Sequence, residues 1–392
     1  MHGVCRLSVS DNLASLSKSG DTDSSADARA FKGLFSTMLW DNPWPTLAWQ
    51  QRLAISFLRV VQIDTPFSPN QSAWHRGTTT TGQCIREHSQ KSRLTYTGKM
   101  IDTSSGEGPP AGLHFVTPPS APENGPTLFY IHGGGYQFPM IPAIQIPLVF
   151  TWAEACKARQ IVFLEYGLAP RYRYPMQLAQ VAAGLQHLVE VEGLPASELI
   201  VGGDSAGGAL VASLLAHLIT PCPHAIPVSL RGDRFKGVFL TSPWVVISTD
   251  QPSYDQNSKT DWESRKLIQQ HAALWEPKVD EVWAAPYEAG NAAQVWYAAF
   301  PTHGESTVAT KVLVTVGTSE VLHDGIVSFA SEFIKAKSII AGPKTDFGIV
   351  GEESRVLVRS LDETHVQPGA DLAMSYFKGT STRATLAWLK SL

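Results

Sequence analysis

The 392-residue chain is short of charge, of cysteine and of long apolar runs. Charged residues make up 17% of it, against about 25% in a typical domain, and the net charge is −4. Without a basic excess it lacks the electrostatic footprint of a nucleic-acid-binding protein, so we expect no nucleic-acid partner. The four cysteines include no C-x-x-C pair and no metal-ligand spacing, which predicts free thiols and no metal site. They are Cys5, Cys84, Cys156 and Cys222.

The sequence also lacks targeting and membrane signals. No stretch of about 20 apolar residues is available to span a bilayer. Residues 1–25 have no basic region followed by an apolar run and a cleavage site, so they do not resemble a signal peptide. We therefore predict a soluble, cytoplasmic protein without a membrane span.

Ser205 is the first residue to suggest chemistry. It lies in Gly203-Asp204-Ser205-Ala206-Gly207, which fits the pattern G-x-S-x-G, between a predicted strand at 199–201 and a predicted helix at 209–218. A sharp strand-to-helix turn strains its central residue and requires small neighbours, and it exposes that residue for nucleophilic attack. The motif alone leaves open a glycine-rich turn with an incidental serine.

A second glycine-rich segment, His132-Gly133-Gly134-Gly135-Tyr136, follows a predicted strand. Attack by a serine on an acyl group places negative charge on the carbonyl oxygen, and backbone N–H groups stabilise that charge. We predict that Gly133 and Gly134 supply such donors, together with the N–H of Ala206. The loop has neither a Lys-Ser/Thr pair nor a G-x-G-x-x-G pattern opening a helix, which disfavours a phosphate-binding loop.

Together, HGGGY at 132–136 and GDSAGG at 203–208 resemble the hormone-sensitive-lipase-like branch of the α/β-hydrolase fold, and we expect a fungal-type esterase. The segment 165–175 resembles another motif of that family, with Gly167 in place of the usual Arg and Arg171 in place of the usual Glu. The resemblance covers roughly residues 110–390. It implies a Ser-His-acid hydrolase with no metal and no organic cofactor.

The order of the triad in this fold is Ser, acid, His, which directs the search for the acid downstream of Ser205. Relatives carry an Asp three residues after the glycine that ends the next-to-last core strand. This chain has Glu320 at that place, after a predicted strand at 311–316, and we predict Glu320 as the acid. Asp324 is the alternative acid, and a solvated loop role for Glu320 stays open.

His365 is the predicted general base. It follows the last predicted strand, at 355–360, and precedes a terminal helix, which is where this fold presents its histidine. His323 shares a loop with the acid and is badly placed to bridge it to Ser205. His271 and His303 precede the acid, out of order for the triad.

The alternation of strands and helices predicts an α/β-hydrolase fold with a mostly parallel, eight-stranded sheet flanked by helices. A predicted hairpin, 92–100 with 114–117, precedes the core. We predict N-terminal cap helices and a leader at 1–90, a hydrolase core at 91–244 and 311–392, and a cap insertion at 245–310. Core strands are predicted at 127–131, 160–165, 198–202, 236–241, 311–316 and 355–360, and helices at 28–39, 47–61, 175–191, 370–377 and 382–389.

These features predict a serine esterase that cleaves a carboxylic ester of a medium-sized apolar metabolite, in secondary metabolism, through a Ser-His-Glu triad. The insertion is rich in tryptophan, which either stacks on the substrate or forms the cap's own core. A non-hydrolytic tailoring enzyme, catalysing acyl transfer, lactonisation or cyclisation, is the alternative, because fold does not determine function. A non-enzymatic binder of the same fold is disfavoured because Ser205 and His365 are both present. A small-molecule ester is the expected partner, and a homodimer stays open.

Overall fold

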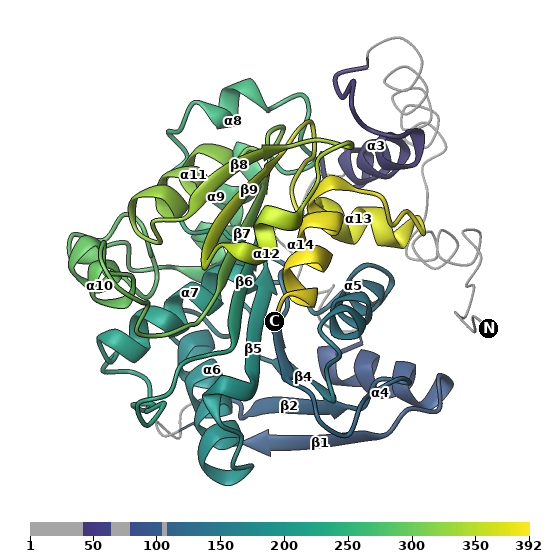
Figure 1. Cartoon of the computed structure of the whole chain (residues 1–392). Helices are drawn as coiled ribbons and strands as arrows, with labels where there is room; N and C mark the ends of the chain where they lie inside the picture. The colour runs from purple at the N-terminus through teal and green to yellow at the C-terminus, as the bar shows by residue number, and fades with distance from the viewer. Residues whose placement is uncertain (1–41, 64–78, 104–107) are drawn as a thin grey trace.

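The computed structural model describes residues 42–63, 79–103 and 108–392. They form one sheet of nine strands, in the order β1-β2-β4-β3-β5-β6-β7-β9-β8 (Figure 1). The strands are β1 (Tyr96–Ile101), β2 (Ala111–Val116), β3 (Thr127–Ile131), β4 (Gln160–Glu165), β5 (Leu199–Asp204), β6 (Gly237–Thr241), β7 (Val312–Gly317), β8 (Lys337–Ala341) and β9 (Arg355–Ser360). β1 and β2 form the predicted antiparallel hairpin, β2 is antiparallel to β4, and all other pairs are parallel.

The predicted α/β-hydrolase architecture with a mostly parallel sheet is confirmed, but the predicted number of eight strands is wrong by one. The missed strand is β8, which pairs only with β9 at the edge of the sheet. Most of its residues are exposed or half-exposed. Because such an edge strand has no need of a continuous apolar run, its sequence carries a weaker signal than the buried strands beside it.

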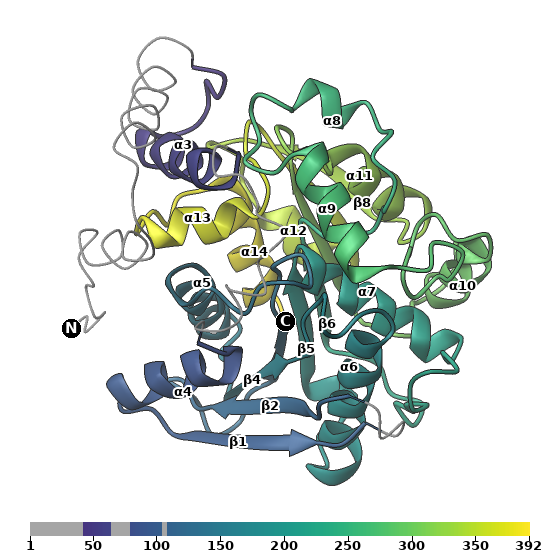
Figure 2. The same ribbon diagram turned by 180° about the vertical axis from the view of Figure 1, so that it is seen from behind.

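Helices cover both faces of the sheet (Figures 1 and 2). Two separate cores result: α4, α5 and α14 pack on one face, and α6, α7 and α11 pack on the other. The helices are α3 (Trp49–Ile63), α4 (Thr81–Lys91), α5 (Pro142–Ala155), α6 (Met176–Gln186), α7 (Ala206–Ile219), α8 (Ser253–Gln256), α9 (Arg265–Trp275), α10 (Ala292–Ala299), α11 (His323–Glu332), α12 (Gly348–Glu352), α13 (Gln367–Ala373) and α14 (Thr380–Lys390).

Most of the predicted helices occur near their predicted positions. The helix predicted at 47–61 is α3, which packs against α13, and the helix predicted at 175–191 is α6 followed by a π-helical turn at His187–Val191. The helix predicted at 28–39 lies outside the described residues, as does Cys5. Cys84, Cys156 and Cys222 are buried free thiols.

The segment between β6 and β7 contains α8, α9 and α10. α10 packs down on α7, and its Trp296 is fully buried against Phe300 and Phe329. This part of the insertion therefore extends the main core on the α7 and α11 face of the sheet. In the described ranges, we find no helix with both the length and the apolar character needed to cross a membrane.

Candidate active site

Ser205 occupies the turn between β5 and α7 in a strained conformation, with φ 52° and ψ −123°. A non-glycine residue at positive φ is uncommon, and such strain is concentrated at functional sites. The two flanking glycines are required by close approach, because a Cβ on Gly207 would collide with the carbonyl oxygen of Ile131 and one on Gly203 with the main chain of Gly207. The small neighbours predicted from the motif thus have a direct steric reason.

The side chains of Ser205, His365 and Glu320 form a continuous hydrogen-bonded chain. Ser205 Oγ lies 2.8 Å from His365 Nε2, and His365 Nδ1 lies 2.7 Å from Glu320 Oε1. Glu320 and His365 follow the neighbouring parallel strands β7 and β9, so their loops meet at one edge of the sheet. The other carboxylate oxygen of Glu320 accepts from Ser242 Oγ at 2.9 Å and from the N–H of Gly317 at 3.1 Å.

The other candidates for acid and base lie apart from this chain. The carboxylate of Asp324 accepts from the main-chain N–H of Ser253 at 2.9 Å and lies 2.9 Å from His323 Nδ1. His303 is exposed in the insertion, and His271 is buried in α9. The only one of the two predicted acids with a hydrogen bond to His365 is therefore Glu320.

Gly133 does not point its N–H toward Ser205. This N–H donates to Asp204 Oδ1 at 3.0 Å, whereas the sequence prediction assigned it to the oxyanion. Asp204 is fully buried, and a buried carboxylate requires donors; it also accepts from Tyr130 and from Gln145. Asp204 thus anchors the glycine loop to the nucleophile turn.

Gly134 and Gly135 follow with positive φ values of 114° and 58°, a conformation that favours glycine. A Cβ on Gly135 would lie 2.6 Å from the ring of His271, so α9 of the insertion packs directly on this loop. Burial lowers the pKa of His271 from 6.5 to about 4, which keeps the imidazole neutral at physiological pH.

His365 is surrounded by carboxylates. Burial disfavours its charged form, but the negative charges of Glu320, Glu263 and Asp261 outweigh that effect and raise its pKa above the ordinary 6.5. Burial in turn raises the pKa of Asp261 to about 6 and that of Glu263 to about 7. Both residues belong to the segment between β6 and β7, so that segment supplies part of the electrostatic environment of the histidine.

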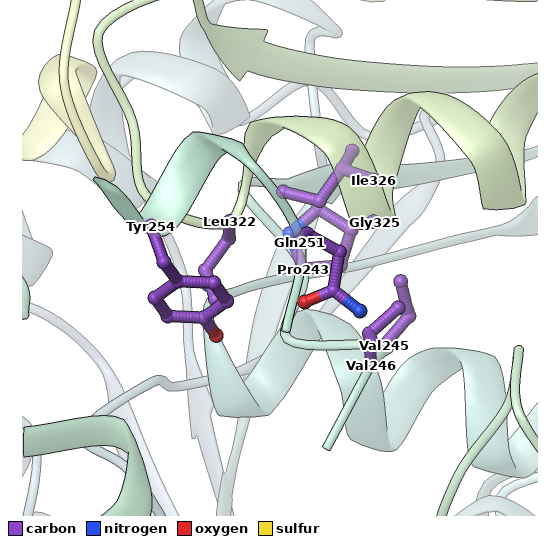
Figure 3. A pocket seen from close by; sticks show the side chains of 8 residues that line it. All are labelled: Pro243, Val245, Val246, Gln251, Tyr254, Leu322, Gly325 and Ile326. Atoms are coloured by element: carbon purple, nitrogen blue, oxygen red, sulfur yellow. The ribbon is translucent and has the colours of Figure 1, made fainter. Parts of the chain in front are cut away.

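Aromatic rings from three segments gather beside the glycine loop. Tyr136 stacks on Trp275 of α9 with ring centroids 4.1 Å apart, and Trp244, which follows β6, lies 5.9 Å from Trp275. All three side chains are buried. A small cavity near Trp244, between the start of the insertion and α11, is lined by eight residues that include Tyr254 and Leu322 (Figure 3). Its volume of about 10 Å³ holds one water at most and cannot accept a metabolite.

Residues 128–339 match the model of a protein family described as having the alpha/beta hydrolase fold. The chain belongs to this family. An acetyl-hydrolase of Streptomyces hygroscopicus is 28% identical over 219 residues, which cover 55% of this chain and 64% of that protein. The arylacetamide deacetylase of Bos taurus is 31% identical over 146 residues, 36% of this chain and 35% of that enzyme. The chain thus spans less than two thirds of the length of these curated relatives.

Solved structures agree with this membership in the alpha/beta hydrolase family. Carboxyl esterase 2 of the mycorrhizal fungus Tuber melanosporum superposes with a TM-score of 0.57 at 20% identity, over 76% of this chain and 86% of that one. An esterase from the bacterial hormone-sensitive lipase family gives a TM-score of 0.59 at 19% identity, over 88% and 97%. The fold expected from the resemblance to hormone-sensitive-lipase-like esterases is confirmed, whereas the fungal type stays a prediction.

Several residues that contact the site carry no signal in the sequence. Ser242 binds Glu320, and Asp261 and Trp262 of the insertion bind the main chain of His365. Arg59 of α3 donates to the main-chain carbonyl of Asp261. No local motif marks these residues, because each lies far along the chain from its partner. In the described part of the chain, no cluster of His, Cys, Asp and Glu is arranged to hold a metal ion.

Proposed function

We propose that this protein hydrolyses carboxylic esters, with Ser205 as nucleophile, His365 as general base and Glu320 as the acid of the triad. The observation that carries this proposal is the pair of short contacts from Ser205 Oγ to His365 and from His365 to Glu320. A serine hydroxyl is a weak nucleophile until an adjacent base accepts its proton, and this arrangement supplies the base and its orienting group.

In the proposed reaction, Ser205 Oγ attacks the ester carbonyl carbon while its proton passes to His365 Nε2. Glu320 holds the proton on Nδ1 and stabilises the imidazolium that forms. The tetrahedral intermediate then expels the alcohol, which takes the proton from Nε2. Water attacks the acyl-enzyme by the same steps in reverse and releases the acid and free Ser205.

The oxyanion requires backbone donors close to Ser205 Oγ. Since Gly133 is bonded to Asp204, we assign this role to the N–H groups of Gly134, Gly135 and Ala206. Gly134 and Gly135 are the next donors along the same loop, and Ala206 begins α7 directly after the nucleophile. Each such donor is worth about 3–4 kcal/mol of transition-state stabilisation.

We propose an ester of a medium-sized apolar metabolite, with a short acyl group such as acetyl, as the substrate class. The names of the relatives, an acetyl-hydrolase and an arylacetamide deacetylase, support a short acyl group. In this proposal 245–310 and the helices before residue 91 act as the cap. Secondary metabolism, the cytoplasm and a homodimer stay predictions.

The test compares Ser205→Ala with Ser213→Ala, a buried serine in α7 whose Oγ only donates to the Ala209 carbonyl. With p-nitrophenyl acetate and butyrate, Ser205→Ala is expected to lower kcat by about 10⁶-fold, and Ser213→Ala to keep most of the activity. A fluorophosphonate probe should label the wild type and not Ser205→Ala. Full activity of Ser205→Ala would disprove the assignment, and a wild type that the probe does not label would favour a non-hydrolytic reaction.

A further inference from the structure

One segment of the insertion, residues 253–262, is bonded along its length to the loop that carries Glu320. Asn257 Nδ2 donates to the carbonyls of Thr318, at 3.1 Å, and of Glu320, at 2.7 Å. Thr260 Oγ1 donates to the carbonyl of Ser319 at 3.2 Å. Since these side chains bind main-chain carbonyls of the loop that carries Glu320, the segment fixes the position of this loop as well as lying beside the site.

Asp261 joins the acid loop to the histidine loop through a single carboxylate. Its Oδ2 accepts from the N–H of Val321, the residue after Glu320, at 2.8 Å. Its Oδ1 accepts from the N–H of His365 at 3.1 Å. The side chain is fully buried, and ionised carboxylates are rarely buried unless such donors surround them. The two loops that carry the acid and the base are thus spaced by a residue from a third segment.

Trp262 binds the main-chain carbonyl of the same histidine. Its Nε1–H donates to the carbonyl of His365 at 2.7 Å, and its ring centroid lies 5.2 Å from that of the imidazole. Consecutive residues of the insertion therefore bind both the N–H and the C=O of His365. With these two main-chain groups held, the main chain of His365 is fixed relative to the insertion, and the imidazole is directed between Glu320 and Ser205.

The hydrogen bonds from Asp261 and Trp262 to His365 matter more here than they would with a triad aspartate. Glu320 carries one more methylene than the Asp of the related motif, so the histidine loop must lie at a distance that suits the longer side chain. Catalytic groups tolerate little misplacement, and an error of 1 Å can cost about 10²-fold in rate. The bridge from Val321 through Asp261 to His365 sets this distance.

We infer that Asp261 and Trp262 are positioning residues for catalysis, which fix His365 at the working distance from Glu320 and make the cap insertion part of the triad's support. The inference rests on the proposed function, because it assigns work to the same site. It also gives Asp261 an electrostatic effect on His365, added to those of Glu320 and Glu263, with Asp204 and His271 as the other ionisable groups coupled to the imidazole.

Two substitutions test the inference, each with a matched control from the insertion. Asp261→Asn replaces one acceptor oxygen by an NH₂ group that cannot accept from a main-chain N–H. Its control is Glu288→Gln, because Glu288 also accepts from two main-chain N–H groups, those of Ile247 and Ser248. Trp262→Phe removes only the bond to the His365 carbonyl. Its control is Trp283→Phe, whose Nε1 donates to the Thr220 carbonyl instead.

The expected result is a loss in kcat on p-nitrophenyl acetate with KM nearly unchanged. Asp261→Asn should lower kcat by about 10²-fold, the cost of a small misplacement, and Trp262→Phe by about fivefold, the value of one neutral hydrogen bond. Asp261→Asn should also shift the acid limb of the pH–rate profile to lower pH, because one negative charge near the imidazolium is lost. Both controls should keep wild-type kcat and the same acid limb.

A spectroscopic readout separates this inference from the proposed function. The proton between His365 Nδ1 and Glu320 gives a low-field NMR signal, identified by its loss in His365→Gln. Both test variants should weaken this signal through faster exchange, even if the ester is no substrate. If Trp262→Phe keeps the signal and kcat, or if the variants change KM alone, the inference is wrong. A wild type without esterase activity but with the expected signal changes would overturn only the proposed function. Trp262→Phe decides the matter if Asp261→Asn fails to fold.

Discussion

The substitution Glu320→Asp restores the acid that the related motif carries and, on this structure, should damage the enzyme. Aspartate is shorter by one methylene, about 1.5 Å. Glu320 Oε1 lies 2.7 Å from His365 Nδ1, so with a fixed main chain the gap widens to about 4 Å, beyond hydrogen-bond reach. The main chain is held, because the Glu320 carbonyl accepts from Asn257 at 2.7 Å and the next N–H is bound to Asp261.

The expected loss follows from these distances. A misplacement of about 1 Å costs about 10²-fold in rate, and removal of the orienting acid costs about 10⁴-fold. We therefore expect kcat/KM to fall by about 10²- to 10⁴-fold, which corresponds to about 2.7–5.4 kcal/mol of lost transition-state stabilisation. The bonds of the carboxylate to Ser242 and Gly317 are lost as well.

The assay for this substitution is steady-state hydrolysis of p-nitrophenyl acetate, with thermal unfolding to show that the variant is folded. Asp324→Asn serves as the control, because this carboxylate lies just after the acid loop, in the first turn of α11, and contacts Ser253 and His323 instead of His365. It should keep near-wild-type kcat/KM. Activity of Glu320→Asp equal to that of the wild type would show that the loops adjust freely and would refute the reasoning. A loss in Asp324→Asn as large as in Glu320→Asp would refute it too.

Two further predictions concern the charges around the site. Neutral His365 is the active base and the nearby carboxylates raise its pKa, so the acid limb of the kcat/KM–pH profile should have its midpoint above pH 6.5. Glu263→Gln should move this acid limb to lower pH. A wild-type midpoint at or below pH 6.5 would contradict the prediction. Tyr130→Phe removes one donor to the buried Asp204 and should lower the free energy of unfolding by about 1.5–3 kcal/mol in urea titrations, whereas Tyr297→Phe at an exposed position should change it by less than about 0.5 kcal/mol. Equal effects of the two tyrosine substitutions would contradict the second prediction.

Much of the fold followed from local patterns. The buried parallel strands are continuous apolar runs, and their alternation with helices indicated a mostly parallel sheet. The edge strand β8 was not predicted, because a strand with exposed residues on both faces carries a weak pattern. Ser205 was predicted from its motif, and Glu320 and His365 from the positions that the family resemblance implies; the structure brings the three side chains within hydrogen-bond distance. The roles of these residues await the experiments above.

Local sequence patterns were enough to predict the buried strands and the turn that requires glycine, because these depend on residues close together along the chain. With the chain order that the family resemblance implies, they also indicated the three loops of the candidate triad. Three contacts are visible in the folded chain alone: Gly133 donates to Asp204, Glu320 and not Asp324 contacts His365, and Asp261 holds the main chain of a histidine 104 residues away. Each of these depends on the direction of a hydrogen bond between distant segments. Packing sets that direction, and no local pattern of residues encodes it.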